Sequence, residues 1–296
     1  MYQNYKVKIF IFAGRQQTME LLMPQLKSDY IDEIIIAKNT NNQNDLRYLD
    51  SLKDNFEKIK YIEIPNEIKR DNHKAWKYLY RFMQDEDSIY FKMDDDVIYI
   101  KPDYFEKTLK FRCEHPEYLC IFPVIVNNPF ICTRLKVHPL MFAKMNNFDL
   151  MRSYFYSGKY GAGLHDLFLM EPEADYWKID NYEIDQKDVY LKPGSSITQC
   201  NTSRIVSGWD YAERICINSI CFFGKDFKEL DVCQKINKSY SDELFLTYNI
   251  FNFTNRKHCI LGDTLICHFA FSGQQGLRER NDILNQYRNL IDEHYK

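Results

Sequence analysis

Strand-like apolar stretches alternate with helix-like segments over the first hundred positions. The strand-like stretches, rich in Ile, Phe and Tyr, are residues 6–12, 32–37, 58–64 and 88–93. The segments between them with apolar residues at helical spacing are 16–27, 45–56 and 71–84. Alternation of strand and helix at this spacing predicts a parallel sheet with right-handed crossovers and helices on its faces.

The second half of the chain has a less regular pattern. Its predicted strands are residues 120–126 and 265–270, and its predicted helices are 102–112, 241–249 and 278–293. Residues 145–205 are rich in Tyr, Asp, Gly and Lys and have weak periodicity. Such a stretch indicates long loops, which often shape a binding site.

Composition narrows the class of protein. The 296 residues are 45% apolar and 16% aromatic, which is ample for a core and suits a cleft that stacks on the rings of a base or sugar. A net charge of −3 without a basic block argues against nucleic acid as the partner. No stretch approaches the roughly 20 apolar residues of a membrane span, and the N-terminus has no apolar signal-peptide core. Nine scattered cysteines without C-x-x-C pairs favour reduced thiols in a cytoplasmic protein.

Three consecutive aspartates, Asp94, Asp95 and Asp96, close the fourth predicted strand. In open parallel sheets, ligands gather outside the carboxyl ends of the strands. Gly14 and Asn39 follow the first and second strands, so they fall on the same edge. Hard cations such as Mg²⁺ and Mn²⁺ bind through one or two carboxylates together with substrate phosphates. The run therefore indicates a divalent cation that holds a diphosphate, with a solvated acidic turn as the alternative.

This order of elements, ending in Asp-x-Asp, resembles the nucleotide-sugar glycosyltransferases of the GT-A fold. The segments 72–76 (NHKAW) and 90–97 (YFKMDDDV) are similar to the Fringe and β3-galactosyltransferase type of inverting enzyme. More of the chain is similar to a set of glycosyltransferases of fungi, bacteria and large DNA viruses. The segments that match them are 126–129, 137–139, 242–247, 268–274 and 282–288. The resemblance spans residues 6–290 with gaps.

The resemblance implies a fold and a division of labour along the chain. The fold would be α/β, of the GT-A (Rossmann-like) type, with a mostly parallel central sheet flanked by helices. Residues 1–296 would form a single domain. Within it, residues 1–100 would be the nucleotide-sugar-binding half, and residues 101–296 a loop-rich half that binds the acceptor and carries out catalysis.

A metal site is also implied by the resemblance. Asp96 would ligate the cation, while Asp94 or Asp95 would contact the ribose or assist the metal. His268, in an apolar run, would be the remaining protein ligand; the alternative is a core histidine with satisfied hydrogen bonds. Imidazole binds Mn²⁺ better than Mg²⁺, so Mn²⁺ is expected ahead of Mg²⁺. The cation would neutralise the charge on the departing nucleoside diphosphate.

Further donor-binding residues are expected beside the metal. Gly14 permits close backbone approach, and Arg15 suits stacking on the base or pairing with a phosphate. Lys74 would place a positive charge near the phosphates, although a solvated helix lysine is an equal alternative. The full set of expected donor-binding residues is Ala13, Gly14, Arg15, Asn39, Lys74, Asp94, Asp95, Gln274 and Arg278. The last two are equally compatible with ordinary surface positions.

The catalytic acid is expected at Asp242 and Glu243. One of them would act as the general base that removes the proton of the acceptor hydroxyl. The alternative is simple capping, because acids are favoured in the first turn of a helix. Inverting relatives use the second acid of a Glu-Asp pair, which points to Glu243. The reversed order of the two acids in this chain leaves Asp242 open.

Aromatic residues in the loop-rich half are candidates for acceptor binding, since aromatic faces suit the C–H surfaces of sugars. They are Tyr156, Tyr160, Trp177 and Trp209, with Asp210 as a further acid, and a core role is at least as compatible with each aromatic residue.

These features describe a metal-dependent glycosyltransferase that moves a sugar from a UDP-sugar, or a GDP-sugar, onto a hydroxyl of a glycan or glycoconjugate, with inversion. A sugar-1-phosphate nucleotidyltransferase shares the sheet and the acidic site. It usually has a Gly-rich, basic loop after the first strand, whereas residues 13–17 contain one glycine. The second alternative is a non-catalytic glycan-binding protein of the same fold, against which the intact Asp96, Glu243 and His268 argue.

Overall fold

The computed structural model describes residues 1–69, 71–128, 158–185, 215–239, 241–269 and 280–295. Within these residues, nine strands form one sheet in the order β3-β2-β1-β4-β8-β6-β9-β5, with β7 beside β9. The strands are β1 (Lys6–Ala13), β2 (Glu33–Lys38), β3 (Ile59–Glu63), β4 (Ser88–Asp94), β5 (Val97–Ile100), β6 (Ile121–Ile125), β7 (Tyr182–Ile184), β8 (Ser219–Phe223) and β9 (His258–His268).

The sheet has a parallel block and a mixed block. β3, β2, β1 and β4 pair in parallel, as the strand–helix alternation predicts. β8 runs antiparallel to both β4 and β6. β9 pairs in parallel with β6 and antiparallel with β5 and β7. The predicted fold class, an α/β sheet of the GT-A, Rossmann-like type, is confirmed.

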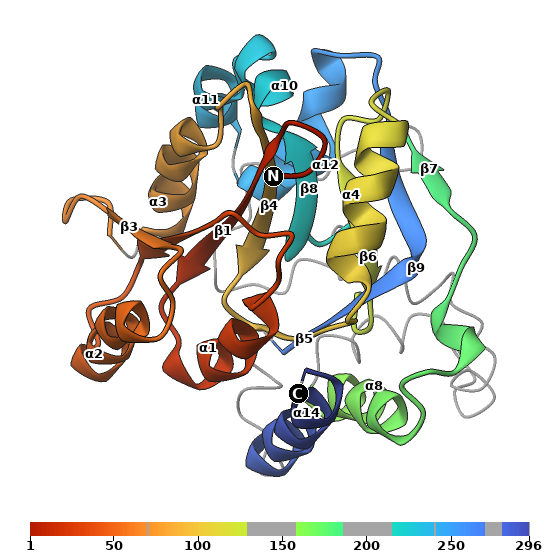
Figure 1. Cartoon of the computed structure of the whole chain (residues 1–296). Helices are drawn as coiled ribbons and strands as arrows, with labels where there is room; N and C mark the ends of the chain where they lie inside the picture. The colour runs from red at the N-terminus through yellow and green to blue at the C-terminus, as the bar shows by residue number, and fades with distance from the viewer. Residues whose placement is uncertain (70, 129–157, 186–214, 240, 270–279, 296) are drawn as a thin grey trace.

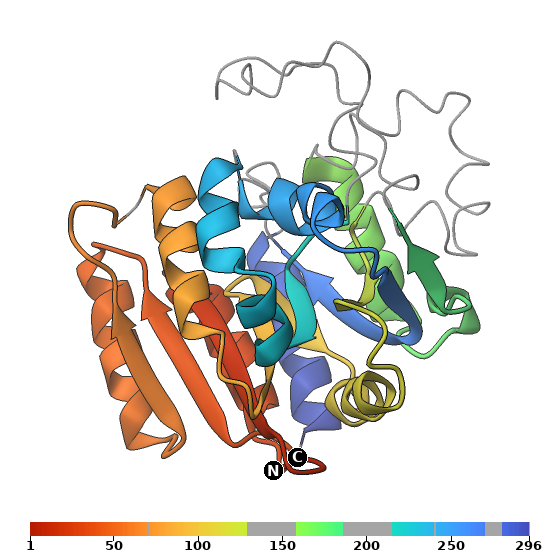
Figure 2. The same ribbon diagram turned by 90° about the horizontal axis from the view of Figure 1, so that it is seen from above.

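Helices cover the sheet on both sides (Figures 1 and 2). α1, α2, α8 and α14 lie along one side in Figure 1, and α3, α10 and α11 lie along the other, with α12 next to α3. The helices are α1 (Gln16–Leu22), α2 (Gln43–Ser51), α3 (Asn72–Leu79), α4 (Tyr104–Glu114), α8 (Gly158–Met170), α10 (Gly224–Glu229), α11 (Val232–Lys235), α12 (Asp242–Thr247) and α14 (Arg280–His294). Short 3-10 turns adjoin several of them: Met23–Leu26, Leu52–Asp54, Tyr80–Phe82, Asp175–Trp177, Ile236–Lys238 and Asn249–Asn252.

Side-chain caps fix where three of these helices begin. The side chain of Asn42 accepts a hydrogen bond of 2.8 Å from the backbone N–H of Asn44 and caps α2. Asp71 caps α3 in the same manner, at 3.1 Å from N of Lys74. Oγ of Ser241 accepts from N of Leu244 at 3.1 Å and caps α12. These contacts satisfy backbone donors that an α-helix leaves unpaired at its N-terminus.

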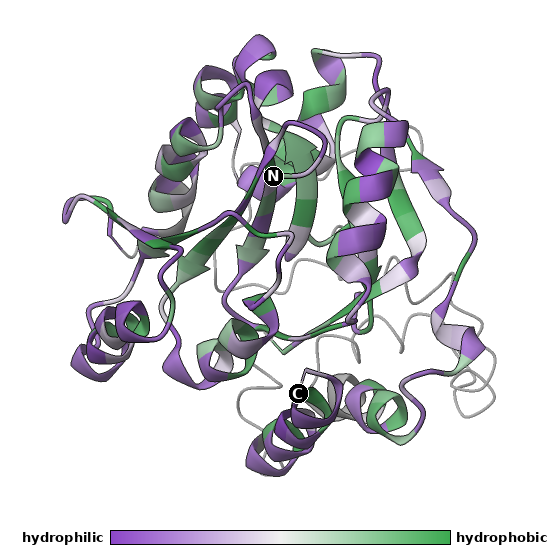
Figure 3. Ribbon diagram, viewed as in Figure 1, coloured by the Kyte–Doolittle hydropathy of each residue, from purple (hydrophilic) through white to green (hydrophobic). Residues whose placement is uncertain are grey.

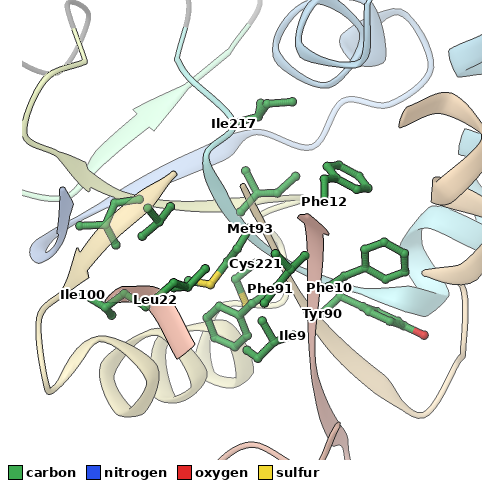
Figure 4. Packing of buried hydrophobic residues seen from close by; sticks show 14 of the residues in the cluster. Ile9, Phe10, Phe12, Leu22, Tyr90, Phe91, Met93, Ile100, Ile217 and Cys221 are labelled. Carbon is green, nitrogen blue, oxygen red and sulfur yellow. The ribbon is translucent and has the colours of Figure 1, made fainter. Parts of the chain in front are cut away.

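The core lies on both faces of the sheet. The strands in the middle of the sheet are mostly apolar, whereas the helices turn one apolar face inward (Figure 3). The register of β1 with β4 places Phe10, Phe12 and Tyr90 on one face and Ile9 and Phe91 on the other (Figure 4). Strands buried on both faces read as continuous apolar runs, which is why the sequence predicts them well.

Several elements differ from the prediction. Residues 158–170, expected to be loop, form α8, and its buried Leu164 and Phe168 belong to the core. The helix contains three glycines, which weaken the helical signal. β9 begins at His258, well before the predicted strand at 265–270, and β5, β7, β8, α10 and α11 were not predicted. Of the rest of the expected loop, residues 171–185 contain β7 and the 3-10 turn Asp175–Trp177, whereas residues 145–157 and 186–205 lie outside the described residues. No helix in the described part of the chain is long and apolar enough to cross a bilayer.

Candidate functional site

A pocket of about 440 Å³ lies at the edge where β1 and β4 end. It is lined by residues from the ends of these strands, the acidic run, the start of β8, α3, α12 and the end of β9. The lining residues are Phe12, Ala13, Gly14, Arg15, Asn39, Trp76, Lys92, Asp94, Asp95, Asp96, Cys216, Ile217, Asn218, Asp242, Glu243 and His268. Its volume is in the range of pockets that bind small molecules and cofactors.

Asp95 is held by the turn that follows β1. Its Oδ2 accepts a hydrogen bond of 2.6 Å from the backbone N of Gly14, and its Oδ1 accepts one of 2.8 Å from Nε of Arg15. Nη2 of Arg15 also contacts Oδ1. Protein donors therefore occupy both oxygens of this buried carboxylate, and the contacts fasten the acidic run to the start of α1.

The two carboxylate oxygens of Asp96 contact different groups, the guanidinium of Arg15 and the imidazole of His268. Oδ2 lies 2.7 Å from Nη2 of Arg15, and Oδ1 lies 3.3 Å from Nε2 of His268. Oδ1 is buried and has no hydrogen-bond partner among the described residues. Burial opposes ionisation of Asp96, but the charge of Arg15 and the contact with His268 outweigh burial and hold its pKa below the usual value. Asp96 therefore has one oxygen paired with Arg15 and the other buried beside His268.

The backbone brings His268 to the acidic run from the far end of the chain. His268 is the last residue of β9 and pairs with Val97, the first residue of β5. The N–H of Phe269 donates to the carbonyl oxygen of Asp96 at 2.9 Å, and Nδ2 of Asn127 donates to the carbonyl oxygen of His268. The imidazole is 3% exposed. The position of His268 therefore follows from strand pairing.

Asp94 is paired with a buried lysine. Nζ of Lys92 lies 2.5 Å from Oδ1 of Asp94, and it also donates to the carbonyl oxygen of Ile217 at 2.9 Å. Nδ2 of Asn218 donates to Oδ2 of Asp94 at 2.9 Å. Lys92 is 1% exposed, so Asp94 balances a charge that would otherwise be buried without a counter-ion.

The two acids of α12 have different surroundings. Asp242 is buried; its Oδ1 accepts from the backbone N of Glu243 at 2.9 Å and its Oδ2 accepts from the hydroxyl of Tyr80 at 3.1 Å. Burial and the charge of Asp94 raise the pKa of Asp242, against the attraction of Lys92. Glu243 is half-buried and lines the pocket. Both acids line the pocket, but the carboxyl group of Asp242 is held by hydrogen bonds within the protein, whereas Glu243 is the more exposed of the two.

Aromatic rings and a close backbone approach form another part of the wall. Phe12 and Trp76 stack with ring centroids 6.5 Å apart, and Nζ of Lys92 lies 4.9 Å from the centroid of Phe12. A Cβ at Gly14 would lie 3.1 Å from the carbonyl oxygen of Asn39. The turns after β1 and β2 are thus packed against each other, and glycine fits where a larger residue would push them apart.

The structure brings most of the expected site residues into this pocket. Ala13, Gly14, Arg15, Asn39, Asp94, Asp95, Asp96, Asp242, Glu243 and His268 all line it. Lys74 does not line it: the lysine is exposed on α3, and its Nζ pairs with Asp71 at 3.0 Å. Trp177 is a core residue, 2% exposed, whose Nε1 donates to the carbonyl oxygen of Glu171 at 2.9 Å. Outside the described residues or side chains lie Tyr156, Tyr160, Trp209, Asp210, Gln274 and Arg278.

Sequence reasoning missed six lining residues: Phe12, Trp76, Lys92, Cys216, Ile217 and Asn218. Two of them carry a signal in the sequence. Lys92 lies two positions before Asp94 in one strand, and Phe12 ends the first strand, so alternation places both side chains on the face that carries Asp94. Asn218 had no such signal, because it reaches Asp94 only through the antiparallel pairing of β8 with β4.

The donor atoms fit a divalent cation that is held together with a diphosphate. Oδ1 of Asp96 and Nε2 of His268 face one another and offer one carboxylate oxygen and one imidazole nitrogen. Such a set leaves coordination positions for phosphate oxygens, and the nitrogen favours Mn²⁺ over Mg²⁺. In the described ranges, no group of three or more His, Cys, Asp or Glu side chains is arranged to hold a metal by itself. The remaining ligands would therefore come from the substrate and water.

Comparison with solved structures gives similarities at low sequence identity. GalNAc-T7, solved with UDP, GalNAc and Mn²⁺, has 10% identity and a TM-score of 0.51 with this chain over 98% of the chain. A mannosyltransferase from Pyrobaculum calidifontis, solved with GDP-Man and Mn²⁺, has 14% identity and a TM-score of 0.35 over 43%. A 4-diphosphocytidyl-2C-methyl-D-erythritolsynthase from Anaerococcus prevotii has 13% identity and a TM-score of 0.42 over 97%.

The likeness to GalNAc-T7 shows the fold alone, an α/β architecture of the GT-A, Rossmann-like type. This chain spans 49% of the length of GalNAc-T7, 38% of the mannosyltransferase and 96% of the synthase. No family model and no curated protein matches the chain.

Proposed function

We propose that this protein is a metal-dependent glycosyltransferase that transfers a sugar from a UDP-sugar to a hydroxyl of a glycan or glycoconjugate. The observation that carries the proposal is that one pocket contains both the buried Asp96–His268 pair and the half-buried Glu243. The pair offers ligands for a cation on the diphosphate. Glu243 offers a base for the acceptor hydroxyl. A protein that only binds glycans needs neither a cation site nor a general base.

The donor would lie across the ends of β1, β2 and β4. The turns at Gly14 and Asn39 present backbone to the nucleoside, and Trp76 with Phe12 presents aromatic surface. The diphosphate would extend toward Asp96 and His268. A cation bound there would neutralise charge on the departing nucleoside diphosphate.

Transfer would be driven by a base on α12. Ser241 caps the helix and Asp242 anchors its first turn through Tyr80, so the carboxylate of Glu243 is held at the pocket by a fixed backbone. In the proposed reaction Glu243 takes the proton of the acceptor hydroxyl while that oxygen attacks the anomeric carbon and the bond to the diphosphate breaks. A displacement of this kind inverts the anomeric centre.

The cation site is tested by calorimetry of UDP with and without Mn²⁺. We expect UDP to bind with Mn²⁺ and to bind weakly or not at all without it. Asp96→Asn should abolish the Mn²⁺-dependent binding, because it removes the carboxylate that faces His268. Asp87→Asn is the matched control, since Asp87 is exposed just before the other end of β4. Unchanged UDP affinity in Asp96→Asn would remove Asp96 from the site.

The reaction is tested by incubation with a panel of nucleotide sugars, Mn²⁺ and candidate glycan acceptors. Release of nucleoside diphosphate with transfer of sugar is the expected result. Formation of pyrophosphate from a nucleoside triphosphate and a sugar 1-phosphate would instead identify a nucleotidyltransferase. Glycan binding without turnover of any donor would identify a non-catalytic protein.

A further inference from the structure

Arg15 engages both carboxylates that lie beside the proposed cation site. Its Nη2 contacts Oδ1 of Asp95 and lies 2.7 Å from Oδ2 of Asp96, and its Nε donates to Oδ1 of Asp95 at 2.8 Å. The side chain of Arg15 is 39% exposed, whereas those of Asp95 and Asp96 are 4% and 5% exposed. The guanidinium is therefore more exposed than the two adjacent buried carboxyl groups that it contacts. Without a positive charge at this place, two like charges would be buried next to each other.

Charge balance explains why this contact matters for a cation. Lys92 balances Asp94, and Arg15 is shared by Asp95 and Asp96, so three carboxylates are opposed by two positive groups. A divalent cation that approaches Asp96 meets a guanidinium on the same carboxylate. A diphosphate changes this balance, because it brings further negative charge and offers the planar guanidinium a bidentate acceptor.

On the basis of the proposed function, we propose that Arg15 is an exchangeable counter-ion. It pairs with Asp95 and Asp96 while no cation is bound, and it transfers to the diphosphate when cation and nucleotide bind together. Mn²⁺ and nucleotide then bind cooperatively, and each raises the affinity of the other by the same factor. Arg15 thereby ensures that the pocket takes up a cation chiefly when a nucleotide accompanies it.

The test is the affinity of the protein for Mn²⁺ alone and with saturating UDP, followed through the electron paramagnetic resonance signal of the unbound ion. Wild type should bind Mn²⁺ weakly alone and about tenfold or more tightly with UDP, in the usual range of coupling between sites. Arg15→Gln should bind Mn²⁺ alone about tenfold more tightly than wild type, with a correspondingly smaller effect of UDP. The matched control is Arg47→Gln, which removes the same charge from an exposed residue of α2 that pairs with Asn44.

A second variant keeps the test decisive if Arg15→Gln does not fold. Arg15→Lys retains the charge but not the fork, so it should bind Mn²⁺ alone as weakly as wild type and gain less from UDP. Full wild-type coupling in Arg15→Lys would overturn the inference. Equal Mn²⁺ affinity of wild type and Arg15→Gln would overturn it as well, as would a gain that persists after Asp96→Asn is added. If wild type binds no UDP with Mn²⁺, the proposed function itself fails. If wild type binds UDP with Mn²⁺ and the Arg15 variants do not differ from it, the inference fails but the proposed function does not.

Discussion

Asp95 and Asp96 are chemically identical neighbours, but their surroundings give them different capacities to bind a ligand. Asp95 has both oxygens occupied by Gly14 and Arg15, whereas Asp96 has a buried oxygen beside His268 without a hydrogen bond in the described structure. A buried polar atom without a hydrogen bond costs about 1–3 kcal/mol, so a ligand that engages this oxygen would recover that cost. The sequence shows the acidic run but not this difference, because the difference depends on residues far away in the chain.

Glu243 and Asp242 form a second pair of neighbouring acids that the sequence leaves ambiguous. We expect Glu243→Gln to preserve Mn²⁺-dependent UDP affinity, because Glu243 is not among the residues that face the cation. Sugar transfer should fall by about 10²–10⁴, the usual contribution of a general base. Calorimetry measures the first quantity and release of UDP in the presence of acceptor measures the second.

The comparison variant is Asp242→Asn, which keeps a similar shape while it replaces the buried carboxyl group next to Tyr80. We expect its main effect on the melting temperature, with a smaller loss of transfer than in Glu243→Gln. Normal transfer in Glu243→Gln together with a large loss in Asp242→Asn would assign the base to Asp242 and exclude Glu243.

At the scale of elements, the start of α10 packs closely against the loop that leads into β4. A Cβ at Gly224 would lie 2.3 Å from the carbonyl oxygen of Asp85 and 2.8 Å from Cε2 of Tyr90. Backbone atoms cannot give way as a flexible side chain does, so Gly224→Ala should lower the free energy of unfolding by about 1–3 kcal/mol or more. Urea denaturation measures this loss.

Gly163→Ala is the matched control in the same experiment. A Cβ at Gly163, within α8, would meet no atom of the described residues within 4 Å. Alanine is favoured over glycine in a helix, so this substitution should raise the free energy of unfolding by about 0.5–1 kcal/mol. If the two variants shift stability in the same direction, the contact between α10 and the β4 loop is less close than the structure shows.

The sequence predicted the elements of the first half better than those of the second for a physical reason. β1, β2 and β4 are buried on both faces, and their long apolar runs need no knowledge of a partner. α8 was missed because glycine disfavours a helix locally, whereas packing of Phe168 against Tyr287 stabilises it in the folded protein. Tertiary contact overrode local preference in that segment.

At the scale of the whole molecule, the pocket depends on a sheet order that no local pattern reveals. β8 inserts between β4 and β6, which brings Asn218 to Asp94, and β9 pairs with β5, which brings His268 to Asp96. Sequence reasoning proposed His268 through a family resemblance, and the strand pairing of the structure supplies a physical cause for its position. Lys74 was also proposed through the resemblance, but no strand pairing brings it to the pocket, and it lies on the exposed surface of α3.

Global stability should depend on pH through His258, which joins the start of β9 to α12. Its Nε2 donates to the carbonyl oxygen of Leu246 at 2.7 Å, and the ring packs between Phe122 and Phe251. Its Nδ1 is buried without a partner among the described residues, so a second proton there would have no acceptor. Burial lowers the pKa of His258 from 6.5 to about 4, and the nearby Arg256 adds to this effect.

The direction in which stability changes with pH follows from proton binding in the folded and unfolded states. Between pH 6.5 and about 4 the unfolded chain binds a proton at His258 that the folded protein excludes, so the stabilisation is complete above pH 6.5 and is lost as the pH falls toward 4. The loss is at most about 3 kcal/mol. His258→Gln keeps an amide donor for the carbonyl oxygen of Leu246 but does not titrate. Urea denaturation of both proteins from pH 7 to pH 4 should therefore show a steeper fall for wild type, whereas parallel curves would mean that His258 accepts its proton without cost. Because Leu246 belongs to the helix that carries Glu243, loosening of this contact would also move the proposed base away from the acceptor.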